Sequence, residues 1–195
     1  MAEKKKNVIV VVNGYDCHLD SPLGWAYLPK VVKFILENRD SIMFVICCGG
    51  FTQRKTASGV SEAFLSGEYI RKELKRECPE IYLEYDSYTS YGNIEEASNG
   101  ISKIANFYRY NTKNFRIVIF CEATRSANVI MLARHFMLKF VESIDDITVE
   151  TASWERADPF KQAFNLIYNK LAITFPWLRL AEREQAKRIR LSEGR

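Results

Sequence analysis

Metal-binding and disulfide-forming residues are scarce in this chain. Of its 195 residues only two are histidine and five are cysteine. There is no Cys-x-x-Cys motif, and the adjacent Cys47-Cys48 pair cannot give the chelating geometry of a zinc knuckle. The odd cysteine count, in a chain where we find no export signal, argues against a set of disulfides. We therefore expect no metal site and a reducing, cytoplasmic compartment.

Long apolar runs and the common phosphate-binding motifs are missing as well. The first apolar run covers only residues 8–12 before Asn13 and Gly14 interrupt it, so it predicts a strand and neither a signal nor a membrane span. Gly-x-Gly-x-x-Gly, the P-loop and the Gly-x-Ser-x-Gly elbow are all absent. The sequence therefore lacks the standard dinucleotide and NTPase fingerprints and a recognisable serine nucleophile.

The net charge of the chain is also small. The formal net charge is +4, with 47% hydrophobic and 27% charged residues, which is ordinary for a globular protein and argues against a general nucleic-acid binder. Basic residues crowd together near the carboxyl end, at Arg179, Arg183, Lys187, Arg188, Arg190 and Arg195. Such a segment is usually a solvated face; a contact surface for a partner is the alternative, and attraction to RNA or an anionic membrane is a minor option.

What is present is an alternation of strand and helix patterns. Five runs rich in β-branched and aromatic residues predict strands at 7–12, 42–47, 81–85, 115–120 and 147–151. Segments of helical period lie between them, which favours a parallel sheet with helices on both faces. We predict a Rossmann-like, doubly wound α/β fold of about five mainly parallel strands in the order 3-2-1-4-5.

The carboxyl-terminal segment follows a different pattern. Residues 159–170 predict an amphipathic helix with Phe160, Phe164, Ile167 and Leu171 on one side, and Pro176 then breaks or kinks the chain. A second helix is expected over 177–190. The prediction is one domain over 1–195, with an α/β core at 7–151 and a helical extension at 158–195.

Small polar residues and glycines follow each of the first four predicted strands. Since the carboxyl ends of parallel strands share one rim, the loops at Asn13-Gly14, Gly49-Gly50, 87–93 and 122–125 are expected to form one ligand pocket. The Gly49-Gly50 amides could cradle an anion, although a tight turn explains the pair more simply.

Several polar side chains in these loops are candidates for binding or chemistry. Ser61 or Ser58 could cap the next helix, and Glu62 in its first turn could bind sugar hydroxyls or accept a proton, although a simple dipole role is the plainer interpretation. The third loop supplies more polar groups than a cap requires, at Glu84, Ser87, Ser90 and Asn93.

The first and fourth loops add titratable residues. Arg125 is either an anion clamp or the partner of Glu122 or Glu62 in an ion pair. His18 could act as acid or base, although a lone loop histidine is more often incidental.

Taken in order, these loops resemble the bacterial family of α/β proteins typified by SanA, ElyC and YdcF. The resemblance covers about residues 8–149 and rests on Gly14, Gly49-Gly50, Ser61-Glu62-Ala63, Glu84-x-x-Ser87, Ser90-x-x-Asn93 and Arg125. It implies a Rossmann-like fold with a nucleotide-sized cleft. SanA and ElyC are membrane-anchored, whereas the YdcF branch is soluble and associated with S-adenosylmethionine, which the resemblance makes a candidate cofactor here.

Four positions depart from the family pattern. Cys48 and Ser90 stand where serine and threonine are usual, and Gly92 stands where a glutamate is common. Glu122 takes the place of a histidine three residues before Arg125. If that histidine is an acid or base in relatives, the activity is altered or lost in this chain.

Together these features predict an intracellular enzyme, or an enzyme-like protein, that binds a nucleotide-type or phosphorylated small molecule. Glu62, Glu122 and His18 are the candidate catalytic residues. The candidate ligand-binding residues are Asn13, Gly14, Gly49, Gly50, Ser61, Glu62, Ser87, Ser90, Asn93 and Arg125. A noncatalytic ligand-sensing or partner-binding protein is the alternative hypothesis.

Overall fold

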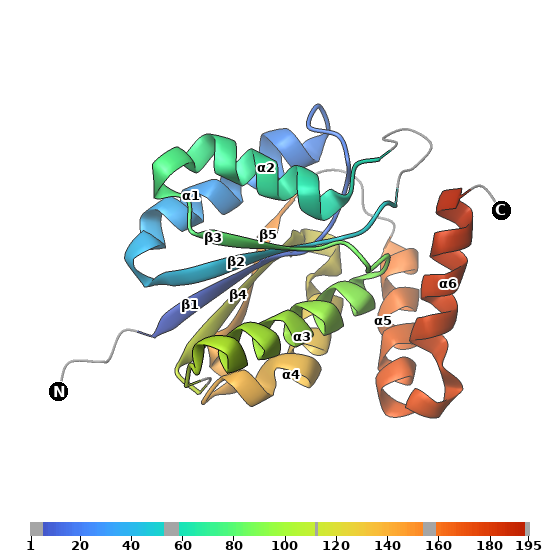
Figure 1. The fold of residues 1–195 in the computed structure, drawn as a ribbon. Helices are drawn as coiled ribbons and strands as arrows, with labels where there is room; N and C mark the ends of the chain where they lie inside the picture. Colours follow the sequence, from blue (N-terminus) through green and yellow to red (C-terminus); the bar gives the residue numbers. More distant parts are fainter. Residues whose placement is uncertain (1–5, 53–58, 112, 154–158, 194–195) are drawn as a thin grey trace.

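A five-stranded, all-parallel sheet forms the centre of the molecule (Figure 1). The computed structural model describes residues 6–52, 59–111, 113–153 and 159–193. The strands are β1 (Asn7–Val12), β2 (Ile42–Cys48), β3 (Glu80–Glu84), β4 (Phe115–Glu122) and β5 (Ile147–Ala152). Their order is β3-β2-β1-β4-β5, which confirms the predicted doubly wound arrangement with its switch point between β1 and β4.

Two pairs of helices cover the two faces of the sheet. They are α1 (Leu28–Asn38) with α2 (Glu62–Leu74) on one face, and α3 (Ser90–Tyr108) with α4 (Ser126–Met137) on the other (Figure 1). Strand β1 alternates between the two cores: Val8, Val10 and Val12 pack toward α1 and α2, whereas Ile9 and Val11 pack toward α3 and α4. A strand buried on both faces has no polar side, which explains its continuous apolar sequence.

A buried tyrosine fixes the switch point where β1 and β4 end. The short π-helix η1 (Leu23–Tyr27) precedes α1 and places the Tyr27 hydroxyl 2.9 Å from the carbonyl oxygen of Asn13 and 2.7 Å from that of Phe120. Both carbonyls lie near the carboxyl ends of β1 and β4, so the Tyr27 hydroxyl stabilises the start of the loops that follow these two strands.

The carboxyl-terminal segment forms a helical hairpin beside that rim (Figure 1). It consists of α5 (Pro159–Thr174), the 3₁₀ turn η7 (Pro176–Leu178) and α6 (Leu180–Glu193). The first predicted helix is confirmed and runs four residues further than expected. The second begins later than predicted, because η7 occupies its expected start and Arg179 adopts a left-handed conformation with φ 50°.

Two side-chain amides hold the hairpin on the core. The Asn169 amide nitrogen on α5 donates to Oδ1 of Asn128 on α4 over 3.0 Å, and both side chains are buried. On α6, Gln185 donates to the carbonyl oxygen of Asp86 over 3.1 Å, in the loop between β3 and α3. Within the described part of the chain no helix has the length and apolarity needed to cross a membrane.

Candidate functional site

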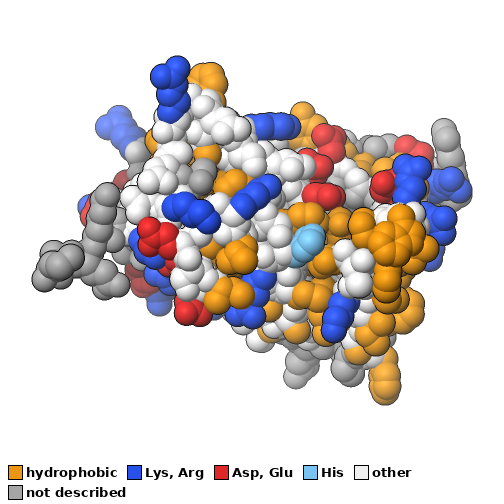
Figure 2. Space-filling model, turned by 90° about the horizontal axis from the view of Figure 1, so that it is seen from below, with side chains coloured by type: hydrophobic (Ala, Val, Ile, Leu, Met, Phe, Trp, Pro, Cys, Tyr) orange, Lys and Arg blue, Asp and Glu red, His pale blue; other side chains and the backbone are white. Residues whose placement is uncertain are grey.

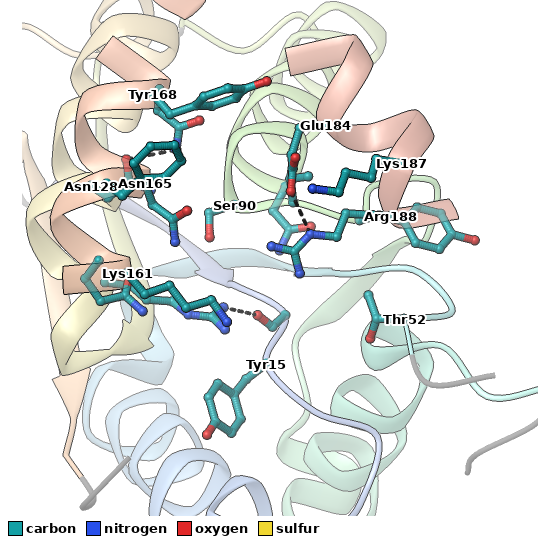
Figure 3. Close-up of a pocket in the computed structure, with 18 of the residues that line it drawn as sticks. Tyr15, Thr52, Ser90, Asn128, Lys161, Asn165, Tyr168, Glu184, Lys187 and Arg188 are labelled. Atoms are coloured by element: carbon teal, nitrogen blue, oxygen red, sulfur yellow. Dashed lines mark hydrogen bonds and ion pairs between the residues drawn. The ribbon is translucent and has the colours of Figure 1, made fainter. Parts of the chain in front are cut away.

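A cavity of about 440 Å³ lies between the carboxyl rim of the sheet and the helical hairpin (Figure 3). From the core it is lined by Gly14, Tyr15, Thr52, Glu62, Tyr88, Thr89, Ser90, Asn93, Arg125 and Asn128. From the hairpin it is lined by Lys161, Gln162, Phe164, Asn165, Tyr168, Asn169, Glu184, Lys187 and Arg188. The hairpin therefore supplies about half of the lining residues.

Five of the predicted site residues meet in this cavity. Gly14 comes from the loop after β1, Glu62 from the start of α2, Ser90 and Asn93 from the first turn of α3, and Arg125 from the turn before α4. These positions are far apart in the sequence, and they converge because parallel strands bring their carboxyl ends to one rim.

The Gly49-Gly50 pair is a correction to the predicted anion cradle. The Gly49 amide donates to the carbonyl oxygen of Glu84 over 2.9 Å, and the Gly50 amide donates to that of Ser87 over 2.7 Å. Because both donors are occupied by the backbone, they are not available to a ligand. The pair is instead the tight turn that the plainer interpretation described.

Glycine at this turn is required by its closeness to Glu62. Gly49 has φ +122°, and a Cβ atom added there would lie 2.5 Å from Oε2 of Glu62. A Cβ atom on Gly14 would lie 2.2 Å from the same oxygen and 2.6 Å from the carbonyl oxygen of Cys48. The two glycines thus leave the space in which the Glu62 carboxyl lies.

Glu62 is the most perturbed carboxyl of the cavity. Its side chain is buried, and this desolvation raises its pKa to about 7, against smaller opposing effects of a hydrogen bond with Thr52 and the charge of Arg125. The Thr52 hydroxyl bonds to its Oε1 atom. A buried carboxyl that titrates near neutrality beside a cavity can act as a general acid or base.

Arg125 contacts the loop after β1 from the opposite side of the rim. Its Nη1 atom donates to the carbonyl oxygen of Gly14 over 3.3 Å, and its guanidinium lies 5.3 Å from the ring centroid of Tyr15. Within the described residues no carboxylate forms an ion pair with it, so the predicted pairs with Glu122 and Glu62 are not formed. The guanidinium keeps donors for an anionic group.

A chain of buried hydrogen bonds holds the Asn93 side chain in place. Its Nδ2 atom donates to Oδ1 of Asn13 over 2.8 Å, and its Oδ1 atom accepts a bond from the Ser87 hydroxyl. That hydroxyl also bonds to the Glu84 carboxyl, whose pKa is raised by burial. Because a hydroxyl donates only one hydrogen, Ser87 can donate to Asn93 and accept from Glu84 when Glu84 is protonated. Asn13 and Ser87 therefore orient a lining residue without lining the cavity themselves.

Three other predicted residues serve the ends of helices or lie apart from the cavity. Ser61 caps α2 by accepting from the Phe64 amide over 3.1 Å, while Ser58 lies outside the described residues. Glu122 caps the turn η4 (Ala123–Arg125) by accepting from the Thr124 amide over 2.9 Å. Neither Glu122 nor His18 is among the residues that line the cavity.

Cys48, directly before the Gly49-Gly50 pair, is also structural. Cys48 is fully buried at the end of β2, and desolvation raises the pKa of its thiol well above the usual value. A buried, neutral thiol is a poor nucleophile. Cys48 is therefore not a candidate nucleophile at the rim.

The hairpin residues are the part of the site that sequence reasoning missed. Lys187 and Arg188 had been counted only in the basic carboxyl segment, and the polar residues Lys161, Asn165 and Asn169 on α5 had not been noted. Their spacing of four places them on one side of a helix, which was the available signal. A polar helix face ordinarily predicts exposure to solvent, so this pattern does not by itself indicate a binding site.

The cavity carries an excess of positive charge. Four cationic side chains line it, Arg125, Lys161, Lys187 and Arg188, against the two carboxyls of Glu62 and Glu184. Arg188 donates from Nε to Glu184 over 2.9 Å, so one of the four cations is paired with one of the two carboxyls. The burial of Glu62 favours its neutral form below about pH 7. An anionic ligand group is the partner that this balance favours.

Comparisons with family models, with curated proteins and with solved structures found no match. The resemblance to the SanA, ElyC and YdcF family therefore stays a prediction. What the protein does has to be inferred from the cavity and its residues.

Proposed function

We propose that this protein is an enzyme that binds an anionic small molecule of nucleotide or sugar-phosphate size, with Glu62 as its general acid and base. The observation that carries the proposal is the meeting of a buried carboxyl with four cationic side chains in one cavity. The cavity volume of 440 Å³ lies within the range of about 300–1,000 Å³ that is usual for small-molecule sites.

The lining residues divide into two groups by chemistry. Arg125 on the core and Lys187 and Arg188 on α6 supply charge for a phosphate or carboxylate from two sides. Asn93 and Ser90 supply an amide and a hydroxyl that can orient the rest of the ligand. With a pKa of about 7, Glu62 can give or take a proton at a ligand hydroxyl or at water under neutral conditions.

S-adenosylmethionine is the second candidate ligand, as the family resemblance implies. Its sulfonium could lie near Glu62 or over the ring of Tyr88, which both line the cavity. Glu84, the other carboxyl considered for this role, lines a different cavity beside β3 and α3. Since cations outnumber carboxyls around the site, we rank nucleotides and sugar phosphates above S-adenosylmethionine. A cytoplasmic setting is part of the proposal, supported by five cysteines that are all free thiols.

Calorimetric binding of adenosine nucleotides, sugar phosphates and S-adenosylmethionine tests the ligand class. We expect Arg125→Ala to weaken binding of the anionic ligand by about tenfold to a hundredfold, because a charge-assisted hydrogen bond is lost. Arg134→Ala is the matched control, since Arg134 is exposed on α4 and does not line the cavity. Equal binding of the anionic ligand by wild type and Arg125→Ala would contradict the proposed anion site.

Turnover separates the enzyme from a noncatalytic sensing protein, which is the alternative. The ligand that binds is incubated with wild type and with Glu62→Gln, and product is followed by chromatography. We expect Glu62→Gln to bind the ligand with similar affinity and to lose about a hundredfold or more in rate, as for a missing general acid–base group. Tight binding without any turnover by the wild type would favour the sensing protein.

A further inference from the structure

The outer side of α5 presents apolar side chains to solvent. Phe160, Phe164, Ile167 and Leu171 are 86%, 66%, 61% and 43% exposed, and Trp177 in the turn η7 is 71% exposed. We call these five residues the outer stripe. Figure 2 shows hydrophobic side chains gathered at the end of the molecule where α5 and α6 lie.

The helix α5 packs Ala172 and Ile173 toward the core, but, unlike an ordinary surface helix, it leaves a larger apolar side facing solvent. Its polar residues Asn165, Tyr168 and Asn169 face the cavity, and Asn169 is buried against Asn128. In a globular protein the apolar side of an amphipathic helix packs on the core. Here the hydrogen bond between the two asparagines fixes the helix with its apolar side outward, which costs free energy in water unless something covers that side.

Most of the charged residues in the hairpin that carries the outer stripe are cationic. From Pro159 to Arg179 the sequence contains Lys161, Lys170 and Arg179 and no aspartate or glutamate. On α6 the exposed residues Arg183 and Arg190 continue this pattern, while the exposed Lys187 also lines the cavity. The α6 carboxyls of Glu182 and Glu184 are neutralised by Arg179 and Arg188.

We propose that the outer stripe docks on the surface of a bilayer that contains anionic lipids. Aromatic and aliphatic side chains on one side of a helix, flanked by lysine and arginine, are the features of helices that lie in the membrane interface. From Phe160 to Leu171 the stripe extends about 16 Å along the helix. Trp177, at the turn that follows, is of the type enriched at the headgroup level.

A second copy of the chain fits this surface less well. Two outer stripes packed against each other would bring the lysines that flank them, Lys161 and Lys170, close to their counterparts, and like charges oppose such contact. An anionic headgroup layer instead attracts each basic residue near it. The bilayer proposal does not depend on the proposed enzyme activity: among the described lining residues of the cavity Phe164 alone belongs to the outer stripe, and the other four stripe residues lie outside the cavity.

Vesicle flotation of the full chain tests the proposal. Vesicles of phosphatidylcholine are compared with vesicles that also contain phosphatidylserine, and we expect binding mainly to the second. The double variant Ile167→Ser with Trp177→Ser should lower the partition coefficient by about tenfold or more, since two exposed apolar anchors are lost. Phe107→Ser is the matched control: Phe107 is 80% exposed on α3 and should not affect binding.

Three results would overturn the proposal. They are no vesicle binding by the wild type, equal binding with and without phosphatidylserine, and a concentration-dependent dimer that the double variant abolishes. Melting temperatures of all variants show whether each is folded. A blue shift of tryptophan emission on vesicle binding that Trp177→Phe removes would support insertion at η7. The variants Glu62→Gln and Arg125→Ala should bind vesicles like the wild type, so this test can fail without affecting the proposed function.

Discussion

The Glu62 side chain is buried and also lines the cavity. The two glycines beside it leave room for the carboxyl, and the rim around it removes most of its water. Desolvation disfavours the charged form, so the folded protein holds the Glu62 proton more tightly than the unfolded chain does. This residue therefore links the stability of the fold to the pH at which it would act.

Glu62 should make the protein less stable as the pH rises through the acid range. Its pKa is about 7 in the folded state and 4.5 when unperturbed, so between these values only the folded state keeps the proton. The free energy of unfolding should fall across this window, relative to Glu62→Gln, and level off above it. A shift of this size corresponds to roughly 3 kcal/mol, at about 1.4 kcal/mol for each pKa unit. Urea unfolding from pH 4 to pH 8 measures it.

Glu73→Gln is the control for this experiment. Glu73 is exposed on the same helix, so its variant should follow the wild-type curve in parallel. Should Glu62→Gln also run parallel to the wild type, the carboxyl would not be perturbed in the folded protein, and its assignment as an acid–base group would lose its support.

Residue types alone predicted part of this site. Glu62, Asn93, Ser90, Gly14 and Arg125 could be placed at the rim because each follows a predicted strand or begins a helix. Their surroundings could not be predicted, because burial and the partner of a hydrogen bond depend on which loops touch. The functional and capping interpretations of a serine or glutamate have the same sequence pattern, and only contacts separate Glu62 from Glu122.

Among the elements, the strands were the most predictable and the hairpin the least. Apolar runs between polar loops predicted all five strands to within about two residues at each end, because a doubly covered strand must be apolar throughout. The period of α5 predicted a helix but not its orientation. The polar side of α5 packs inward because Asn169 finds a buried partner in Asn128, a contact between segments 41 residues apart.

This asparagine pair should be important for docking of the hairpin. Asn169→Ala removes the donor and leaves Oδ1 of Asn128 buried without it, so we expect the free energy of unfolding to fall by about 1–3 kcal/mol. Asn165→Ala is the matched control, one helical turn earlier on the same side of α5, where we expect little change because alanine also favours the helix. Equal losses in the two variants would mean that the hydrogen bond does not anchor α5. Chemical denaturation followed by circular dichroism measures both.

For the whole molecule, the main consequence is that two separate parts of the chain share one cavity. The core supplies Glu62 and Arg125. The hairpin supplies Lys187 and Arg188 (Figure 3). Sequence patterns described the two parts separately, since a fold prediction from periodicity does not say where a terminal helix packs. A ligand that contacts both parts would gain affinity only when the hairpin is docked, so binding and docking should stabilise each other.

Hydrogen exchange followed by mass spectrometry measures this coupling. With a saturating nucleotide or sugar phosphate that binds, we expect slower amide exchange in α5 and α6 as well as around Arg125, because the bound anion bridges the hairpin and the core. The double variant Lys187→Ala with Arg188→Ala should lose the slowing in the hairpin, while Arg190→Ala, exposed on the same helix and outside the cavity, should keep it. Slower exchange confined to the core in the wild type would mean that the ligand does not reach the hairpin, and the cavity would then be a site of the core alone.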